Sequence, residues 1–202
     1  MNKHKSLHIF EYIKFKMAET TSNMLPLGTE APNFKLWDTV SDSIKSLNKL
    51  KGPNGTIVMF ICNHCPFVTH INEALVTFAD ELKKKGISVI AISSNDAKKY
   101  PQDGPRAMEL HARKMKYSFP YLYDRTQDIA KAYNAACTPE FYLFNSDLKL
   151  TYRGQLDESR PGNGLPVDGS DLRHAVSCLI KNKENKRTQK PSIGCSIKWK
   201  HS

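Results

Sequence analysis

Long apolar runs, internal repeats and a cysteine framework are all missing from this sequence of 202 residues. No uninterrupted apolar stretch approaches the about 20 residues that a bilayer-spanning helix needs, so we expect no membrane partner. The five cysteines are odd in number and only two lie close together, which excludes a disulfide scaffold and indicates an intracellular protein. With 40% apolar and 25% charged residues, the composition is typical of one globular domain with short extensions.

Acidic residues are also scarce, because 20 Asp and Glu face 30 Lys and Arg, which gives a net charge of +10. Residues 1–16 carry a net charge of +3 and residues 181–202 carry +6, so the body between them is nearly neutral. Basic ends of this kind are usually solvated extensions, and we therefore expect no nucleic-acid partner.

The two ends of the sequence are predicted to lie outside the folded body. Glu11 and Lys14 interrupt the apolar stretch near the N-terminus, unlike a secretory signal, and its lack of arginine is unlike a mitochondrial presequence. We predict a flexible extension over residues 1–22, one domain over residues 23–181 and a basic tail over residues 182–202. The expected location is cytoplasmic, with organelle targeting by the extension as the alternative.

Apolar segments separated by turn signals predict an α/β fold. Residues 56–61 form a continuous apolar run, as in a strand buried on both faces, and residues 66–85 carry apolar side chains at helical spacing. Further strands are expected at 34–37, 87–92 and 119–123, followed by a hairpin of 141–144 and 148–152. Further helices are expected at 105–116, 127–134 and 172–179. This order predicts a central mixed β-sheet flanked by helices on both faces.

Two cysteines lie where the strand at 56–61 meets the helix that begins at Pro66. Unpaired backbone N–H groups and the helix dipole at a helix N-terminus stabilise a thiolate, which is the nucleophilic form of cysteine. Cys65 precedes the first turn, and Cys62 lies three residues upstream, a spacing that allows a disulfide. His64 between them supports the thiolate when the imidazole is protonated.

The same Cys-x-x-Cys spacing occurs in zinc sites, but those usually contain a second cysteine pair. Cys137 and Cys195 are single, so we expect no metal and no other cofactor, and two inert buried thiols are the remaining alternative. Thr138-Pro139 precedes an apolar strand, and a proline at such a place is a candidate for a cis peptide bond.

An apolar strand, Cys65-Pro66, a helix and then Thr138-Pro139 before a strand together resemble the thioredoxin superfamily. Within it, the segments 31–34, 60–68, 136–141, 152–157 and 191–195 are similar to a peroxiredoxin-like branch of the alkyl hydroperoxide reductase and thiol-specific antioxidant (AhpC/TSA) family. The resemblance covers roughly residues 23–200 and implies a thioredoxin-like fold and a redox activity. In this comparison Cys65 matches the attacking cysteine, while Cys62 takes the place of the peroxiredoxin threonine that positions the peroxide.

We predict that Cys65 is the nucleophile and that Cys62, the nearest thiol in sequence, reacts with it. Cys137 and Cys195 are the alternative resolving cysteines. The resemblance implies that Thr138 and Pro139 dock the substrate backbone. Arg153, like His64, is predicted to support the thiolate.

Three functions follow from these residues. The first is a thiol-disulfide oxidoreductase, the second a thiol peroxidase, and the third a redox-sensing or metal-clip binding protein without turnover. The expected partners are a protein or low-molecular-weight thiol as reductant and a disulfide or peroxide as substrate. A homodimer is left open.

Overall fold

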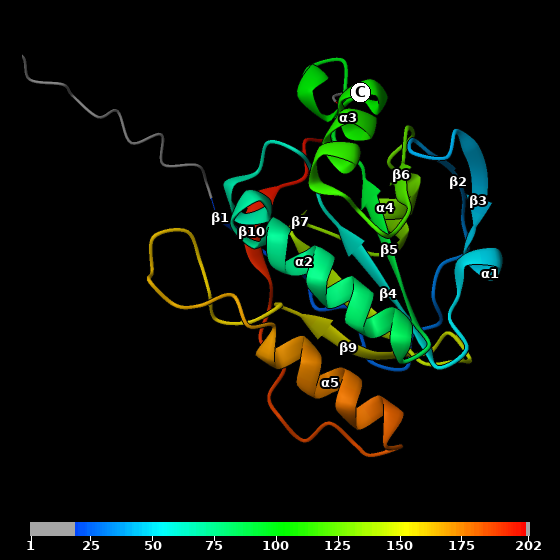
Figure 1. Ribbon diagram of the computed structural model, residues 1–202, viewed down its shortest axis with the longest axis vertical. Helices are drawn as coiled ribbons and strands as arrows, with labels where there is room; N and C mark the ends of the chain where they lie inside the picture. Colours follow the sequence, from blue (N-terminus) through cyan, green and yellow to red (C-terminus); the bar gives the residue numbers. More distant parts are fainter. Residues whose placement is uncertain (1–18, 201–202) are drawn as a thin grey trace, which may run out of the picture.

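The computed structural model describes residues 19–200 (Figure 1). The strands are β1 (Glu19–Thr21), β2 (Lys35–Asp38), β3 (Ser43–Ser46), β4 (Gly55–Phe60), β5 (Ile87–Ser93), β6 (Tyr121–Tyr123), β7 (Cys137–Thr138), β8 (Glu140–Phe144), β9 (Leu150–Gly154) and β10 (Ile193–Ser196). The helices are α1 (Leu47–Leu50), α2 (Pro66–Lys84), α3 (Pro105–Met115), α4 (Asp128–Ala132) and α5 (Ser170–Ile180), with a 3₁₀ turn, η1, at Pro101–Asp103.

The main sheet has seven strands in the order β3-β2-β6-β5-β4-β8-β9. β4 runs parallel to β5, and β5 to β6, whereas the other neighbours are antiparallel. The predicted mixed sheet is therefore confirmed. The main strands and helices lie close to their predicted places, but β3 and α1 fall in a region from which no regular element was expected.

Alternation along the central strands divides the core into two layers. On β4, Ile57 and Met59 face a cluster with residues of α2, α3 and α5, while Val58 and Phe60 face a cluster with residues of α1 and α4. All six residues of β4 are buried, as the continuous apolar run predicted. Helices thus cover both faces of the sheet, and β4 carries the chain toward the start of α2, which lies beside β10 (Figure 1).

The C-terminal segment differs from the prediction of a tail over residues 182–202. β10 forms the middle strand of a second sheet, between β1 and β7. Cys195 and Ile197 are buried in the two different core clusters, and their burial offsets the entropy lost when this segment becomes ordered. β1 likewise lies inside the extension predicted over residues 1–22, of which residues 1–18 are outside the described part.

Within residues 19–200, no helix combines the length and the apolar character needed to cross a bilayer.

Candidate active site

Cys65 lies at the N-terminus of the longest described helix. It is the N-cap residue of α2, with Pro66 in the first turn, and its carbonyl oxygen accepts a hydrogen bond from the Thr69 backbone N–H at 2.9 Å. The Cys65 side chain is fully buried. The local sequence explains this position, because β4 ends at Phe60 and proline at the first helical position starts the helix six residues later.

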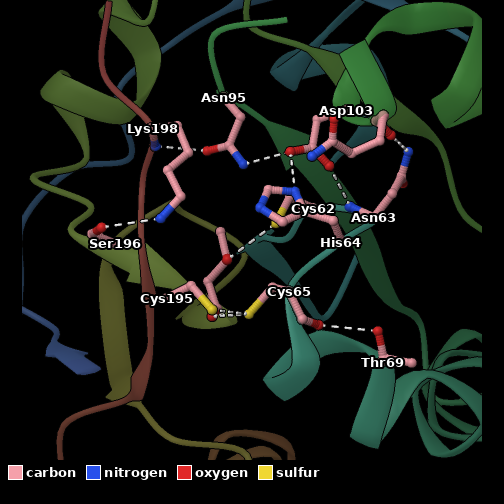
Figure 2. Close-up of polar contacts among 12 residues, drawn as sticks. Cys62, Asn63, His64, Cys65, Thr69, Asn95, Asp103, Cys195, Ser196 and Lys198 are labelled. Atoms are coloured by element: carbon pink, nitrogen blue, oxygen red, sulfur yellow. Dashed lines mark hydrogen bonds and ion pairs between the residues drawn. The ribbon is translucent and has the colours of Figure 1, made fainter. Parts of the chain in front are cut away.

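The sulfur of Cys65 touches a cysteine from the other end of the described chain. Cys65 Sγ lies 2.9 Å from Cys195 Sγ and 3.1 Å from the carbonyl oxygen of Thr138 (Figure 2). Hydrogen bonding by the Cys195 thiol, then by the Cys62 thiol and the Val68 N–H, holds the pKa of Cys65 well below its usual range despite burial. The same contact raises the pKa of Cys195. These opposite shifts favour a thiolate on Cys65 over one on Cys195.

Cys62 lies on the other side of this group. Its Sγ is 3.4 Å from the hydroxyl oxygen of Thr138, and its side chain is 2% exposed. Its hydrogen bond to Cys65 and burial raise the pKa of Cys62. The Thr138–Pro139 peptide bond is cis, as predicted. Pro139 lines a surface groove together with Phe67, Phe141 and Arg160.

An aspartate that the sequence reasoning missed completes the site. Asp103 ends η1 and is fully buried, and its Oδ2 lies 2.5 Å from His64 Nδ1. It accepts hydrogen bonds from the Asn63 backbone N–H at 2.9 Å and from Asn95 Nδ2 at 2.8 Å. Asn95 in turn accepts the Lys198 backbone N–H at 2.8 Å, which ties this network to the C-terminal segment (Figure 2).

Two other cysteines, Cys137 and Cys178, have hydrogen-bond partners other than Cys65. Cys137 is buried in β7 with its Sγ 3.8 Å from Glu140 Oε2, and burial followed by the nearby Glu140 charge raises its pKa. Cys178 is half-buried on α5, where its Sγ lies 3.5 Å from His174 Nε2. Neither sulfur therefore has a hydrogen bond to Cys65 Sγ.

The prediction that Arg153 supports the thiolate is wrong in this structure. Arg153 stands opposite Tyr142 in the β8–β9 register, and Tyr142 packs in the cluster on the sheet face away from α2. Alternation along β9 therefore directs Arg153 away from Cys65. Its guanidinium instead donates to the Leu25 carbonyl oxygen and to Gln189 Oε1, both at 2.8 Å.

We accordingly expect Arg153→Gln to change the rate of Cys65 oxidation by less than about twofold, while losing two hydrogen bonds worth about 1 kcal/mol each. Urea unfolding and the oxidation rate, measured on the same preparation, check both parts. A tenfold slower oxidation with unchanged unfolding would show that Arg153 acts on the thiolate.

The seven-stranded mixed sheet, the cysteine at the start of α2 and the cis-proline before β8 define a thioredoxin-like fold with a buried thiol centre. The model of the AhpC/TSA family matches residues 27–153, and the chain belongs to this family. None of the curated proteins matches it.

Solved structures share this fold. An uncharacterised conserved protein from Geobacillus kaustophilus is 52% identical over 92% of this chain and 98% of its own, with a TM-score of 0.90. A hypothetical protein from Sinorhizobium meliloti is 45% identical over 91% of this chain and 100% of its own, with a TM-score of 0.88. The thioredoxin domain of a thiol-disulfide oxidoreductase from Bacteroides vulgatus shares the fold at 19% identity over 77% of this chain and 99% of its own (TM-score 0.60).

Proposed function

We propose that this protein is a thiol-disulfide oxidoreductase in which Cys65 attacks the substrate disulfide and Cys195 resolves the mixed disulfide that forms. The observation that carries the proposal is the 2.9 Å contact between the two sulfurs. Proximity in sequence favoured Cys62 as the resolving thiol, whereas proximity in space favours Cys195, which β10 holds against Thr138. Cys62 remains the second candidate because it also hydrogen bonds to Cys65.

The reaction consumes one disulfide and two protein thiols. The Cys65 thiolate attacks one sulfur of the substrate disulfide and forms a mixed disulfide, while the other substrate sulfur leaves as a thiolate and takes up a proton. Cys195 then attacks Cys65 Sγ, which releases the second substrate thiol and leaves a Cys65–Cys195 disulfide. A thiol reductant, as a protein or a small molecule, restores both thiols.

Burial limits how a substrate reaches this centre. Cys65 is fully buried and Cys62 is 2% exposed, so a small disulfide, or an extended segment that enters beside Pro139, suits the site better than a folded surface. The groove lined by Phe67, Pro139 and Arg160 supports substrate docking at Thr138 and Pro139. We place this chemistry in the cytoplasm, where reductants return thiols to the reduced state.

Trapping the mixed disulfide tests the proposal. The reduced protein is treated with 2-hydroxyethyl disulfide, and the products are mapped by mass spectrometry. Wild type is expected to release two thiols and to form the Cys65–Cys195 disulfide, whereas Cys195→Ser releases one and keeps the adduct on Cys65. The matched control Cys178→Ser, remote from Cys65, follows wild type.

The other outcomes of this experiment are equally definite. If Cys62→Ser accumulates the adduct and Cys195→Ser does not, Cys62 is the resolving thiol. An adduct on another cysteine, with Cys65 unmodified, contradicts the proposed function.

A thiol peroxidase is the second candidate, and membership of the AhpC/TSA family favours it. The Cys65 thiolate would attack a peroxide oxygen to give a sulfenic acid and an alcohol or water, and a second thiol would form a disulfide with loss of water. Stopped-flow oxidation by hydrogen peroxide distinguishes the two functions. If hydrogen peroxide oxidises Cys65 no faster than a free cysteine, the peroxidase function is contradicted and disulfides remain as the substrate.

A further inference from the structure

Three metal-binding side chains converge beside the thiol centre. Cys62, His64 and Asp103 each offer one ligand atom, and these atoms lie within 4.8 Å of one another. Figure 2 shows the His64 ring next to the Asp103 carboxylate, with the Cys62 sulfur overlapping the ring in this view. The sequence places His64 beside the cysteine pair, but it gives no reason to add Asp103, which lies about 40 residues downstream in a loop.

We propose that Cys62, His64 and Asp103 form a zinc site with a fourth position open to water. Thiolate, imidazole and carboxylate are the donors that Zn²⁺ binds, and three protein ligands with one open position is a common arrangement. Tetrahedral bonds of about 2.0 to 2.3 Å place ligand atoms about 3.5 Å apart. His64 Nδ1 and Asp103 Oδ2 are 2.5 Å apart without the ion, so binding it requires this distance to increase by about 1 Å. It also requires Cys62 Sγ to move toward the ion.

The burial of Asp103 is a second, independent reason for a cation here. A fully buried carboxylate is costly unless a cation compensates it, and within residues 19–200 His64 is the only side chain that forms an ion pair with Asp103. Lys198 does not serve, because its ammonium group lies 3.4 Å from Ser196 Oγ instead.

The neighbours of the three side chains already orient them as ligands. The Asn63 N–H and Asn95 Nδ2 hold the two oxygens of Asp103, and the Thr138 hydroxyl lies 3.4 Å from Cys62 Sγ. The His64 ring stacks on Tyr100 with centroids 5.7 Å apart. Outer contacts of this kind fix ligand geometry in metal sites.

Zinc would give the two cysteines of the Cys-x-x-Cys motif different roles. Bound to the ion, Cys62 stays a thiolate that does not enter a disulfide. Cys65 and Cys195 remain in contact with each other. The site does not depend on the proposed function, because binding is an equilibrium property of the reduced protein.

Cobalt titration of the reduced, full-length protein without oxygen tests the site. Co²⁺ is expected to bind with one equivalent and to give a sulfur-to-cobalt charge-transfer band, which Zn²⁺ then abolishes by displacement. Cys62→Ser is expected to lose the band, and His64→Ala and Asp103→Asn to weaken binding at least about tenfold.

A second cysteine–histidine contact provides the matched control. Cys178 and His174 lie 3.5 Å apart on α5, so Cys178→Ser and His174→Ala are expected to bind Co²⁺ as wild type does. Thermal unfolding without metal shows which variants fold. If Asp103→Asn does not fold, His64→Ala still tests the site, because His64 is only half-buried. The proposal is overturned if wild type gives no charge-transfer band, if Cys62→Ser keeps it, or if His64→Ala binds as tightly as wild type. Trapping on Cys65 is scored separately, so the two proposals fail independently.

Discussion

Replacing Cys65 with serine is expected to slow the reaction with 2-hydroxyethyl disulfide by at least about 10³-fold. The serine hydroxyl stays protonated at neutral pH and is a poor nucleophile, and Cys62 and Cys137 do not replace Cys65, because their surroundings raise their pKa values. The release of substrate thiol under excess disulfide, followed by a chromogenic thiol reagent, gives the rate constant.

Cys178→Ser is the control for Cys65→Ser, because it removes a thiol without touching the group around α2. Its rate is expected to equal that of wild type. If Cys65→Ser kept more than a tenth of the wild-type rate while Cys62→Ser lost it, Cys62 would be the attacking thiol.

Gly194→Ala is expected to destabilise the protein by about 3 kcal/mol and to prevent the Cys65–Cys195 disulfide from forming. A Cβ atom at Gly194 would overlap the Thr138 carbonyl oxygen and lie 2.7 Å from its carbonyl carbon. Both atoms belong to backbone, so β10 must move away from β7, and Cys195 moves with it. Urea unfolding measures the first effect and disulfide mapping the second.

Gly162→Ala separates this steric effect from the general cost of replacing glycine. Gly162 has a φ of 82° but nothing within 4 Å of an added Cβ, so its replacement is expected to cost about 1 kcal/mol of backbone strain and to leave the disulfide intact. Equal destabilisation by the two variants would show that the close approach of β10 to β7 contributes little.

The sequence predicts the centre of the molecule because local signals and burial agree there. The apolar run before Cys62 forms β4, the periodic positions after Pro66 form α2, and Pro139 adopts the cis form. The cysteine at the junction of β4 and α2 was therefore predictable from residues close together in the chain.

The rest of the site depends on contacts between distant segments, which no local pattern reports. Asp103 is one acidic residue in a polar loop, and only the fold brings it to His64. Cys195 lies in a basic, tail-like segment, and its contact with Cys65 spans 130 residues. Arg153 was predicted to lie near Cys65 but does not, because the register of β9 places it on the other face of the sheet.

The position of β10 also links redox chemistry to the order of synthesis. The Cys-x-x-Cys motif leaves the ribosome early, whereas Cys195 follows 130 residues after Cys65. An emerging chain thus holds both motif thiols before the strand that joins β1 to β7 exists. Its Cys65 therefore meets the thiol that contributes most to its lowered pKa only when β10 is in place.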